Sequence, residues 1–198
     1  IRRLPIRLTF DDNYFNDRYQ GIPIGGYTSI FEKMLDGIPV ELNTDFHLDR
    51  ETFLSKFDHV IFTGPIDSFF DYSLGHLEYR SLRFDHQLIN CSDFQGNAVI
   101  NHTEAQIPYT RTYEHKHFDM NFSADRSTVT YEYPDKWEPG KIEIYPVNTD
   151  ENQTLFSKYQ DMTKEFPNVT FGGRLGQYRY FDMHQVIGAS LEKVKSLA

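Results

Sequence analysis

The sequence predicts an α+β fold (mixed α/β), in which an antiparallel β-sheet is inserted into an incomplete α/β domain. Apolar residues recur at helical spacing near both ends of the chain, but between about residues 77 and 133 this spacing gives way to successive β-rich runs. The outer segments can share one sheet, so an insertion explains the order α/β, then β, then α/β.

In the first segment, which runs to about Pro65, the residue pattern predicts three strands and one helix joined by turns. The predicted strands cover Leu4–Phe10, Val40–Leu42 and His59–Thr63. A helix is expected over Tyr27–Asp36 because its apolar residues have helical spacing and Gly37 follows as a stop. The last strand stops at Gly64-Pro65, which is typical of a strand end that faces a ligand or a turn.

For the rest of the chain, the residue pattern predicts the inserted sheet followed by a second α/β segment. The predicted sheet strands cover Leu77–Phe84, Gly96–Asn101, Tyr109–His115 and Ser127–Tyr133. A helix containing Leu155, Phe156, Tyr159 and Met162 follows, then a strand at Asn168–Phe171 and a helix from Asp182 to about Ser196. This segment contributes no Gly-x-Gly-x-x-Gly, and neither does the first, so the phosphate-binding first unit of a nucleotide-binding domain is missing.

Length, charge and composition argue against several classes of protein. The chain has 198 residues, enough for a real core, and its net charge of −9 disfavours general nucleic-acid binding. No apolar stretch approaches the roughly 18 residues of a membrane span. The single Cys91 and the lack of a signal-like segment favour a reducing cytoplasm. Because the chain opens with Ile1 in a strand-like run, we expect it to be a piece of a longer protein.

The run from Tyr109 to His117 holds the first candidate site. Strand alternation would place Tyr109, Arg111, Tyr113, His115 and His117 on one face. An arginine between aromatic side chains fits a nucleotide diphosphate, and the alternative is a solvated sheet face. The two histidines predict no metal site, because no third ligand of matching spacing stands nearby.

The second candidate site is the glycine-rich stretch that precedes the last helix. Its glycines allow a ligand to approach the backbone. Asp182 and Gln185 have the spacing of a capping box, so the simplest role for Asp182 is the helix cap. A capped helix N-terminus would also stabilise an anion or an electron-rich ring, so the two roles are compatible. Asp11 and Asp12 are interpreted as turn residues, and no motif supplies a nucleophile.

Seven motifs in order carry a resemblance to a known family. They are Arg3-Leu-Pro-Ile-Arg-Leu-Thr-Phe-Asp-Asp-Asn-Tyr14, Tyr-Gln-Gly-Ile-Pro-Ile-Gly-Gly-Tyr27, Thr-Gly-Pro-Ile-Asp67, Leu-Glu-Tyr-Arg-Ser-Leu82, Pro-Tyr-Thr-Arg111, Glu-His-Lys116 and Gly-Gly-Arg-Leu-Gly176. Together they resemble UDP-galactopyranose mutase, an isomerase, from one end of this chain to the other. The resemblance covers about the C-terminal half of such an enzyme.

The resemblance implies an FAD enzyme that interconverts UDP-galactopyranose and UDP-galactofuranose, a cytoplasmic step towards cell-surface polysaccharides. The flavin must be reduced, although no net oxidation or reduction occurs. In the family, flavin N5 attacks the anomeric carbon and UDP leaves. The sugar ring then opens as a covalent flavin adduct and closes as a furanose. The cofactor therefore supplies the nucleophile that this sequence lacks.

The resemblance also implies site residues. Arg3 and Arg111 match the arginines that hold the diphosphate, and Tyr14 and Tyr145 match tyrosines that contact phosphate. Tyr180 and Asp182 match further active-site positions, so Arg3, Arg111, Tyr180 and Asp182 are the expected catalytic residues, and Tyr180 is expected to bind substrate as well. The expected cofactor-binding residues are Gly64, Pro65, Gly173, Arg174, Asp182 and Met183.

The departure from the family is large, because the first FAD-binding unit and most of the helical domain are absent. The helical domain carries a tryptophan on its mobile substrate loop, and Trp137 does not replace it. The expected division is a partial FAD-binding domain with the end of the helical connection at 1–75, a substrate sheet at 76–146 and a return to the FAD domain at 147–198. Exposed apolar faces favour a homodimer.

We therefore expect the fragment to be inactive by itself and not to retain FAD. One alternative is a module that binds UDP or a nucleotide sugar without catalysis. Another is an FAD oxidoreductase that shares only the architecture, against which the motifs around Arg3 and Arg111 argue.

Overall fold

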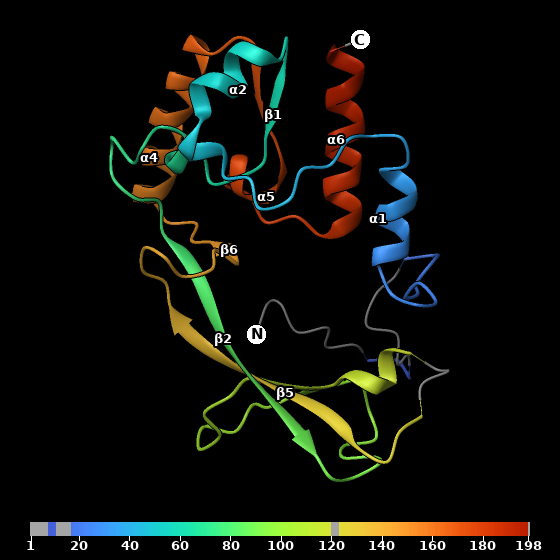
Figure 1. Ribbon diagram of the computed structural model, residues 1–198. Coiled ribbons are helices and arrows are strands. Elements are labelled where there is room, and N and C mark those ends of the chain that lie inside the picture. Colours follow the sequence, from blue (N-terminus) through green and yellow to red (C-terminus); the bar gives the residue numbers. More distant parts are fainter. Residues whose placement is uncertain (1–7, 11–16, 120–122, 198) are drawn as a thin grey trace.

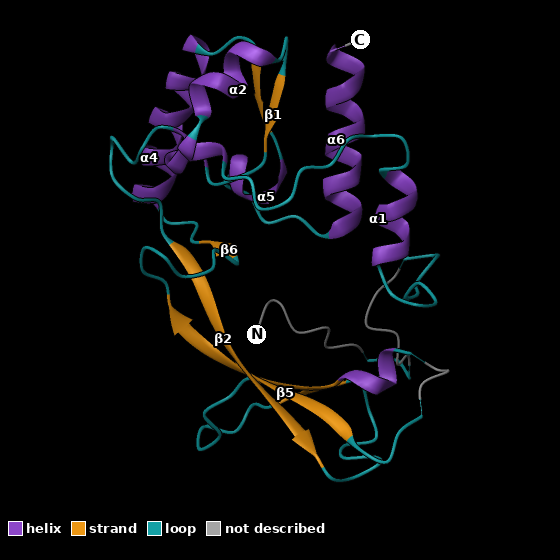
Figure 2. Ribbon diagram, in the orientation of Figure 1, coloured by secondary structure: helices purple, strands orange, loops and turns teal. Residues whose placement is uncertain are grey.

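The computed structural model describes residues 8–10, 17–119 and 123–197. Most helices and two short parallel strands gather at one end of the molecule, and a long pair of antiparallel strands forms the other end (Figures 1 and 2). The mixed α/β class with an inserted antiparallel sheet is confirmed. The domain boundaries at residues 75 and 146 stay predictions.

The α/β part joins segments that lie far apart in the sequence. Strand β1 (Val60–Phe62) pairs in parallel with β7 (Val169–Phe171). The helices beside them are α2 (Arg50–Lys56), α3 (Ile66–Phe69), α4 (Asp150–Met162) and α5 (Gly173–Gly176), with short 3-10 turns η1 (Phe46–Leu48) and η3 (Thr163–Glu165). The outer segments therefore share one sheet, as predicted from their order.

Aromatic side chains form the core of this part. Phe69 is 1% exposed, and its ring lies 4.9 Å from that of Phe171 and 5.2 Å from that of Phe62 in edge-to-face contacts. The Tyr159 ring is fully buried, and its hydroxyl donates to the Gly75 carbonyl at 2.6 Å. Burial of these large rings supplies most of the apolar stabilisation of the α/β part.

The inserted sheet has the strand order β3-β4-β5-β2-β6. The strands are β2 (Tyr79–Ile89), β3 (Val99–Asn101), β4 (Arg111–Glu114), β5 (Ser127–Lys136) and β6 (Tyr145–Pro146). Strands β2 and β5 pair from Arg80 with Lys136 to Ile89 with Ser127, and every neighbouring pair is antiparallel. The 3-10 helix η2 (His115–Phe118) follows β4 directly.

Two buried polar side chains fix where the sheet leaves the α/β part. The Tyr178 hydroxyl donates to the Glu78 carbonyl at 2.6 Å and accepts from the Val147 N–H at 3.2 Å. Asn152, in α4, accepts from the Glu78 N–H and donates to the Val147 carbonyl. These contacts hold the chain just before β2 and just after β6 against the α/β part.

Two strand predictions at the N-terminal side are wrong. The described residues of the first one, Leu8–Phe10, form no strand, and Leu8 is fully exposed; residues 4–7 lie outside the described part. Val40–Leu42 also form no strand. Val40 and Leu42 are 54% and 79% exposed, because no described segment pairs with them. The predicted helix over Tyr27–Asp36 is confirmed as α1 (Thr28–Met34).

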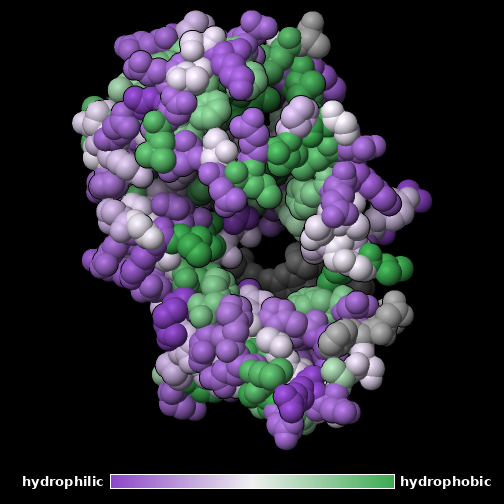
Figure 3. Space-filling view, in the orientation of Figure 1, coloured by the Kyte–Doolittle hydropathy of each residue, from purple (hydrophilic) through white to green (hydrophobic). Residues whose placement is uncertain are grey.

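The last helix, α6 (Met183–Leu197), carries an apolar stripe that stays exposed. Ile187, Leu191 and Val194 are 54%, 59% and 55% exposed. Apolar side chains gather over this helix in Figure 3, whereas the sheet end shows mostly polar ones. Among the described residues, no helix is both long and apolar enough to cross a membrane.

Candidate functional site: an arginine network on the sheet and two tyrosines beside it

Register and alternation place one set of side chains on the same face of the sheet. Residues paired directly across antiparallel strands share a face. Arg111 pairs with both Asn101 and Glu132, and Tyr113 pairs with Thr130. This face also carries, by the same register, Arg80, Phe84, His86 and Tyr145.

Arg111 is held in a network of polar side chains. Its Nε donates to Asn101 Oδ1 at 2.8 Å and its Nη1 donates to the Tyr113 hydroxyl at 3.0 Å. Nη1 lies 3.6 Å from Glu132 Oε2, and the Tyr113 hydroxyl donates to that same oxygen. The side chain of Arg111 remains 39% exposed. The guanidinium is thus fixed in orientation while one side still faces outward.

The surroundings keep Arg111 charged. Burial opposes the charged form, but the hydrogen bond with Tyr113 and the negative charge of Glu132 outweigh it, so the pKa of Arg111 lies above its usual value. Tyr145 adds a smaller contribution in the same direction to the pKa of Arg111. By register, two of the predicted substrate-binding residues, Arg111 and Tyr145, lie on the same face of the sheet.

Tyr145 and Tyr180 form a stacked pair beside the arginine network. Their ring centroids are 5.4 Å apart, and the rings are inclined by 30°. Arg174 lies over both rings, at 5.4 Å from Tyr145 and 4.7 Å from Tyr180. Its guanidinium donates to the carbonyls of Ile144 and Phe181 at 3.1 and 2.5 Å. Arg174 therefore ties the segment before β6 to the segment before α6, and so keeps the two tyrosines together.

Asp182 joins this pair through its carboxylate. Burial raises the pKa of the Tyr180 hydroxyl, and so do the charge of Asp182 and the hydrogen bond between the two side chains. The capping-box spacing produces one of its two bonds: the Asp182 N–H donates to Gln185 Oε1 at 2.9 Å. Asp182 thus starts α6 through its backbone, while its carboxylate bonds Tyr180.

The expected glycines lie where the two parallel strands end. Gly173 has a φ of +71°, and a Cβ added there would lie 3.6 Å from the Cβ of Thr63. At Gly64 an added Cβ would lie 2.7 Å from the Phe62 ring. The turns after β1 and β7 therefore pack closely together, at the carboxyl edge where ligands of α/β sheets bind.

Of the remaining predicted site residues, Pro65 and Met183 lie in the described part of the chain and Arg3 and Tyr14 do not. Pro65 starts the turn into α3, and its carbonyl accepts from the Ser68 hydroxyl at 2.7 Å. Met183 is 66% exposed at the first position of α6. Arg3 and Tyr14 lie outside the described residues, so their predicted roles stay predictions.

The prediction that five alternating residues share a face is wrong at both ends. Arg111 and Tyr113 share a face, and His115 bonds Thr130 on that side at 2.6 Å. Tyr109 instead packs against Tyr131 and Tyr133 on the opposite face. His117 does not lie on the predicted face either, because it belongs to the 3-10 helix η2 that follows the short strand β4. Strand β4 covers only Arg111–Glu114, so alternation does not extend beyond it.

His117 belongs to an ionic cluster at the sheet edge. The possible ligand atoms of Asp93, Glu114 and His117 lie within 4.8 Å of one another. Lys116 Nζ is 3.5 Å from Glu114, which also accepts from the backbone of the loop after β2 and from the Ser127 hydroxyl at 2.5 Å. The backbone N–H groups that Glu114 accepts from anchor that loop to β4.

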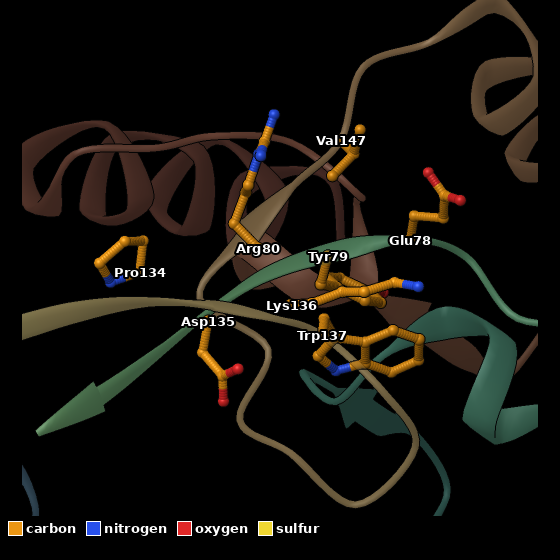
Figure 4. A pocket seen from close by; sticks show the side chains of 8 residues that line it. All are labelled: Glu78, Tyr79, Arg80, Pro134, Asp135, Lys136, Trp137 and Val147. Carbon is orange, nitrogen blue, oxygen red and sulfur yellow. The ribbon is translucent and has the colours of Figure 1, made fainter. Parts of the chain in front are cut away.

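A cavity of about 440 Å³ lies where β2 and β5 meet the α/β part (Figure 4). Arg80 and Trp137 project to opposite sides of β2 there. The Trp137 ring packs edge-on against Tyr79 at 5.4 Å, and its indole N–H donates to the Lys141 carbonyl at 3.2 Å. Trp137 therefore packs at the junction, within the β portion in which the sequence places it.

Comparison with known proteins decides the family. A family model described as UDP-galactopyranose mutase matches residues 1–180. The chain belongs to the UDP-galactopyranose mutase family. It is 39% identical over 194 residues to the "Probable UDP-galactopyranose mutase" of Klebsiella pneumoniae, covering 97% of this chain and 50% of that protein. It is 36% identical over 197 residues to the "dTDP-fucopyranose mutase" of Escherichia coli, covering 97% of this chain and 52% of that protein.

This member of the UDP-galactopyranose mutase family spans about half the length of the curated relatives it matches. The UDP-galactopyranose mutase of Mycoplasma genitalium is 35% identical over 212 residues, covering 52% of that protein. A solved structure titled "Crystal structure of reduced UDP-Galactopyranose mutase" matches with a TM-score of 0.55 and 14% identity. It covers 72% of this chain and 42% of that one, and supports the fold alone.

Sequence reasoning missed three residues of the arginine network as functional partners. Asn101 and Glu132 lie on neighbouring strands, and only the register shows that they flank Arg111. Tyr113 was placed on the correct face, but nothing in the sequence shows that its hydroxyl bonds both Arg111 and Glu132. An acidic residue predicted opposite an arginine in a strand pair was the available signal for Glu132.

Proposed function

We propose that this chain supplies the diphosphate-binding half of a flavin-dependent mutase that interconverts the pyranose and furanose forms of a nucleoside-diphosphate sugar. One observation carries the proposal: Arg111 is fixed by Asn101 and Tyr113, on the face of the sheet that also carries Tyr145. Fixed cationic donors beside hydroxyl groups are what a diphosphate requires. Family membership supports UDP-galactose as the first substrate to test.

The arrangement accounts for how the leaving group would be retained. A partly exposed guanidinium bonds phosphate oxygens in a forked geometry, and the stacked rings of Tyr145 and Tyr180 offer two hydroxyls as further donors. Holding the diphosphate in place keeps it close to the anomeric carbon for the return step. Arg3 and Tyr14 are proposed to complete this contact.

The residues at the carboxyl edge of β1 and β7 fit one side of a flavin. Gly173 has a left-handed backbone, Met183 is exposed and α6 starts at Asp182, and these are the residues proposed to contact a flat ring. When bound, reduced flavin supplies the nucleophile for the anomeric carbon. Arg174 has a narrower role here, because its guanidinium already bonds two carbonyls and orients Tyr180.

A longer protein that contains this chain tests the proposal directly. With dithionite-reduced flavin, it should convert UDP-galactopyranose to UDP-galactofuranose without consuming electrons, as followed by chromatography. The isolated chain should be inactive and retain little FAD, because it spans only half the length of its relatives. Conversion that requires stoichiometric reductant would contradict the mutase proposal and favour an oxidoreductase.

A second candidate substrate rests on a specific observation. The chain is 36% identical over 197 residues to a protein named dTDP-fucopyranose mutase, so a deoxythymidine-linked 6-deoxy sugar is the alternative. The diphosphate contacts proposed for Arg111 and Tyr145 serve both nucleotides equally. Competition between UDP-galactopyranose and dTDP-fucopyranose for the same longer protein distinguishes them by the ratio of kcat/KM values.

The non-catalytic alternative makes a different prediction for the isolated chain. A freestanding module for UDP or a nucleotide sugar should bind UDP appreciably in calorimetry without any flavin. Under the mutase proposal, the isolated chain offers only part of the site and binds UDP weakly. Binding by the isolated chain as tight as that of the longer protein would favour the module.

A further inference from the structure

The Tyr113 hydroxyl lies between two opposite charges that face each other across the sheet. Arg111 and Glu132 are direct partners in the register of β4 and β5. Their closest described approach, from Nη1 to Oε2, is nevertheless 3.6 Å, whereas a charge-assisted hydrogen bond measures about 2.7–2.9 Å. The Tyr113 hydroxyl accepts from Arg111 Nη1 at 3.0 Å and donates to Glu132 Oε2. The pair is therefore bridged by a neutral group.

Glu132 needs this donor because its side chain is only 8% exposed. A buried carboxylate without hydrogen-bond donors is costly, and it takes the nearest donor available. Each of its two carboxylate oxygens accepts a hydrogen bond from a different hydroxyl group. Oε1 accepts from the Thr110 hydroxyl at 3.1 Å, and Oε2 accepts from Tyr113. Glu132 is thus satisfied without a short direct bond to Arg111.

Arg111 keeps an outward-facing donor as a result. Nε donates to Asn101, on the neighbouring strand β3, and Nη1 donates to Tyr113. Within the described part of the chain, Nη2 makes no hydrogen bond, and the side chain is 39% exposed. The guanidinium is oriented, and Glu132 at 3.6 Å offsets its charge only in part because no direct hydrogen bond joins the two described side chains.

We propose that Tyr113 is a positioning residue: its hydroxyl keeps Glu132 from closing onto Arg111, so that the guanidinium stays available to a diphosphate. This inference rests on the proposed function. The tyrosine sets how strongly the sheet binds anions without touching the ligand itself. It also lets a buried carboxylate orient the arginine through a neutral intermediary.

Removing the hydroxyl should change the partner of Glu132. In Tyr113→Phe, Oε2 loses its donor, and the nearest replacement is Arg111 Nη1, 3.6 Å away. The buried pair should close to a direct salt bridge, which turns the guanidinium towards the sheet. Anion binding at Arg111 should then weaken by roughly three- to tenfold, the scale of one partly exposed charge interaction.

A second substitution separates this effect from simple damage to the sheet. Glu132→Gln removes the charge that attracts Arg111 but retains an oxygen that can accept from Tyr113. The double variant Tyr113→Phe, Glu132→Gln should therefore regain wild-type anion affinity or exceed it. Tyr109→Phe is the matched control, because that ring packs on Tyr131 and Tyr133 on the opposite face.

The probe is inorganic pyrophosphate, titrated into the isolated chain and followed by the ¹⁵N-resolved Arg111 Nε–H signal. Crystal structures of the wild type and of Tyr113→Phe measure the Arg111–Glu132 separation without any ligand. In the longer enzyme, Tyr113→Phe should raise KM for the nucleotide sugar by the same factor while kcat stays nearly constant. A purely structural role would lower kcat as well.

The outcomes separate the two proposals. If the Arg111–Glu132 distance in Tyr113→Phe stays near its present value and pyrophosphate binds as in the wild type, the positioning role is overturned. If the pair closes but no variant, Glu132→Gln included, responds to pyrophosphate, Tyr113 does separate the charges and the diphosphate function of Arg111 is wrong. Loss of affinity in Tyr113→Phe that the double variant does not rescue also rejects the inference.

Discussion

The two parts of the molecule bury different kinds of side chain. Buried apolar residues of the α/β part are Phe62, Ile66, Phe69, Phe70, Leu77, Tyr159, Val169, Tyr178 and Phe181. Buried polar residues of the sheet are Ser81, Thr112, Glu114, Ser127, Thr130 and Glu132, and its buried apolar residues are Tyr79 and Val129. The first part is held by ring packing and the second by hydrogen bonds between side chains.

This difference in buried side chains indicates how each part can contribute to binding a charged ligand. Packed aromatic rings stabilise the α/β part but offer no charged groups themselves. A sheet whose interior is polar must satisfy every carboxylate, and in doing so it orients donors such as Arg111. The aromatic rings accordingly stabilise the α/β part, and the polar sheet orients the charge of Arg111.

The largest expected effect is on the aromatic core. Phe69→Ala should reduce the free energy of unfolding by about 3–5 kcal/mol, because it leaves a cavity among packed rings. Urea unfolding followed by tyrosine and tryptophan fluorescence measures this loss. The sheet control Phe84→Ala, at a side chain that is 39% exposed, should cost under about 1 kcal/mol. Equal losses would mean that the two parts do not differ as described.

The second effect concerns the buried carboxylate of the sheet. Glu114→Gln should cost about 2–4 kcal/mol, because an amide group would meet the N–H donors of Phe94 and Gln95. Burial alone would raise the pKa of Glu114. Those N–H donors and the Ser127 hydroxyl outweigh burial and lower the pKa to about 2.

The same carboxylate predicts a pH dependence. Because the folded pKa of about 2 lies below the ordinary value of 4.5, Glu114 stabilises the fold above pH 4.5. This contribution is lost as the pH falls from 4.5 through about 2, since the unfolded state binds the proton first. The stability difference between wild type and Glu114→Gln should shrink over that range. A difference that stays constant down to pH 2.5 would contradict it.

The junction between the parts should show an intermediate effect. Tyr178→Phe removes a hydroxyl that bonds both the Glu78 carbonyl and the Val147 N–H, so it should cost about 1–2 kcal/mol. Burial raises the pKa of this hydroxyl to about 12, so the loss should not vary between pH 6 and pH 9. Denaturant melts at both pH values test this, with Tyr180→Phe as the exposed control.

The smallest effect on stability is expected at the proposed active site. Asp182→Ala should change the free energy of unfolding by less than about 1 kcal/mol, because the carboxylate is exposed and α6 keeps its backbone bond to Gln185. In the longer enzyme the same substitution should lower turnover more than UDP binding. Equal losses in turnover and in UDP binding would contradict the proposed role beside the flavin.

Much of the fold could be predicted from local patterns. The helices at α1, α4 and α6 and the strands β1, β2, β4, β5 and β7 follow from residue spacing and from stops such as Gly37. Val40–Leu42 was mistaken for a strand because a short apolar run looks the same whether or not another strand pairs with it. Pairing is a property of the whole fold and has no local signature.

For the candidate site, too, the sequence indicated residues correctly as neighbours in some places and misplaced them in others. The family motifs indicated Arg111, Tyr145, Tyr180 and Asp182, which the structure groups on and beside the sheet. The places of Tyr109 and His117 were wrong, because a four-residue strand ends before alternation reaches them. Where a strand stops depends on its neighbours, and the sequence of that strand does not contain them.

From the sequence alone follow the order of the elements and a set of candidate diphosphate-binding residues that remains a prediction, because spacing and residue type are local properties. Only the tertiary structure decided that Asn101, Tyr113 and Glu132 surround Arg111. Three strands separated in sequence bring these side chains together, and a register shifted by one residue would turn each of them to the other face. The hydrogen bonds that orient the guanidinium exist only in that register.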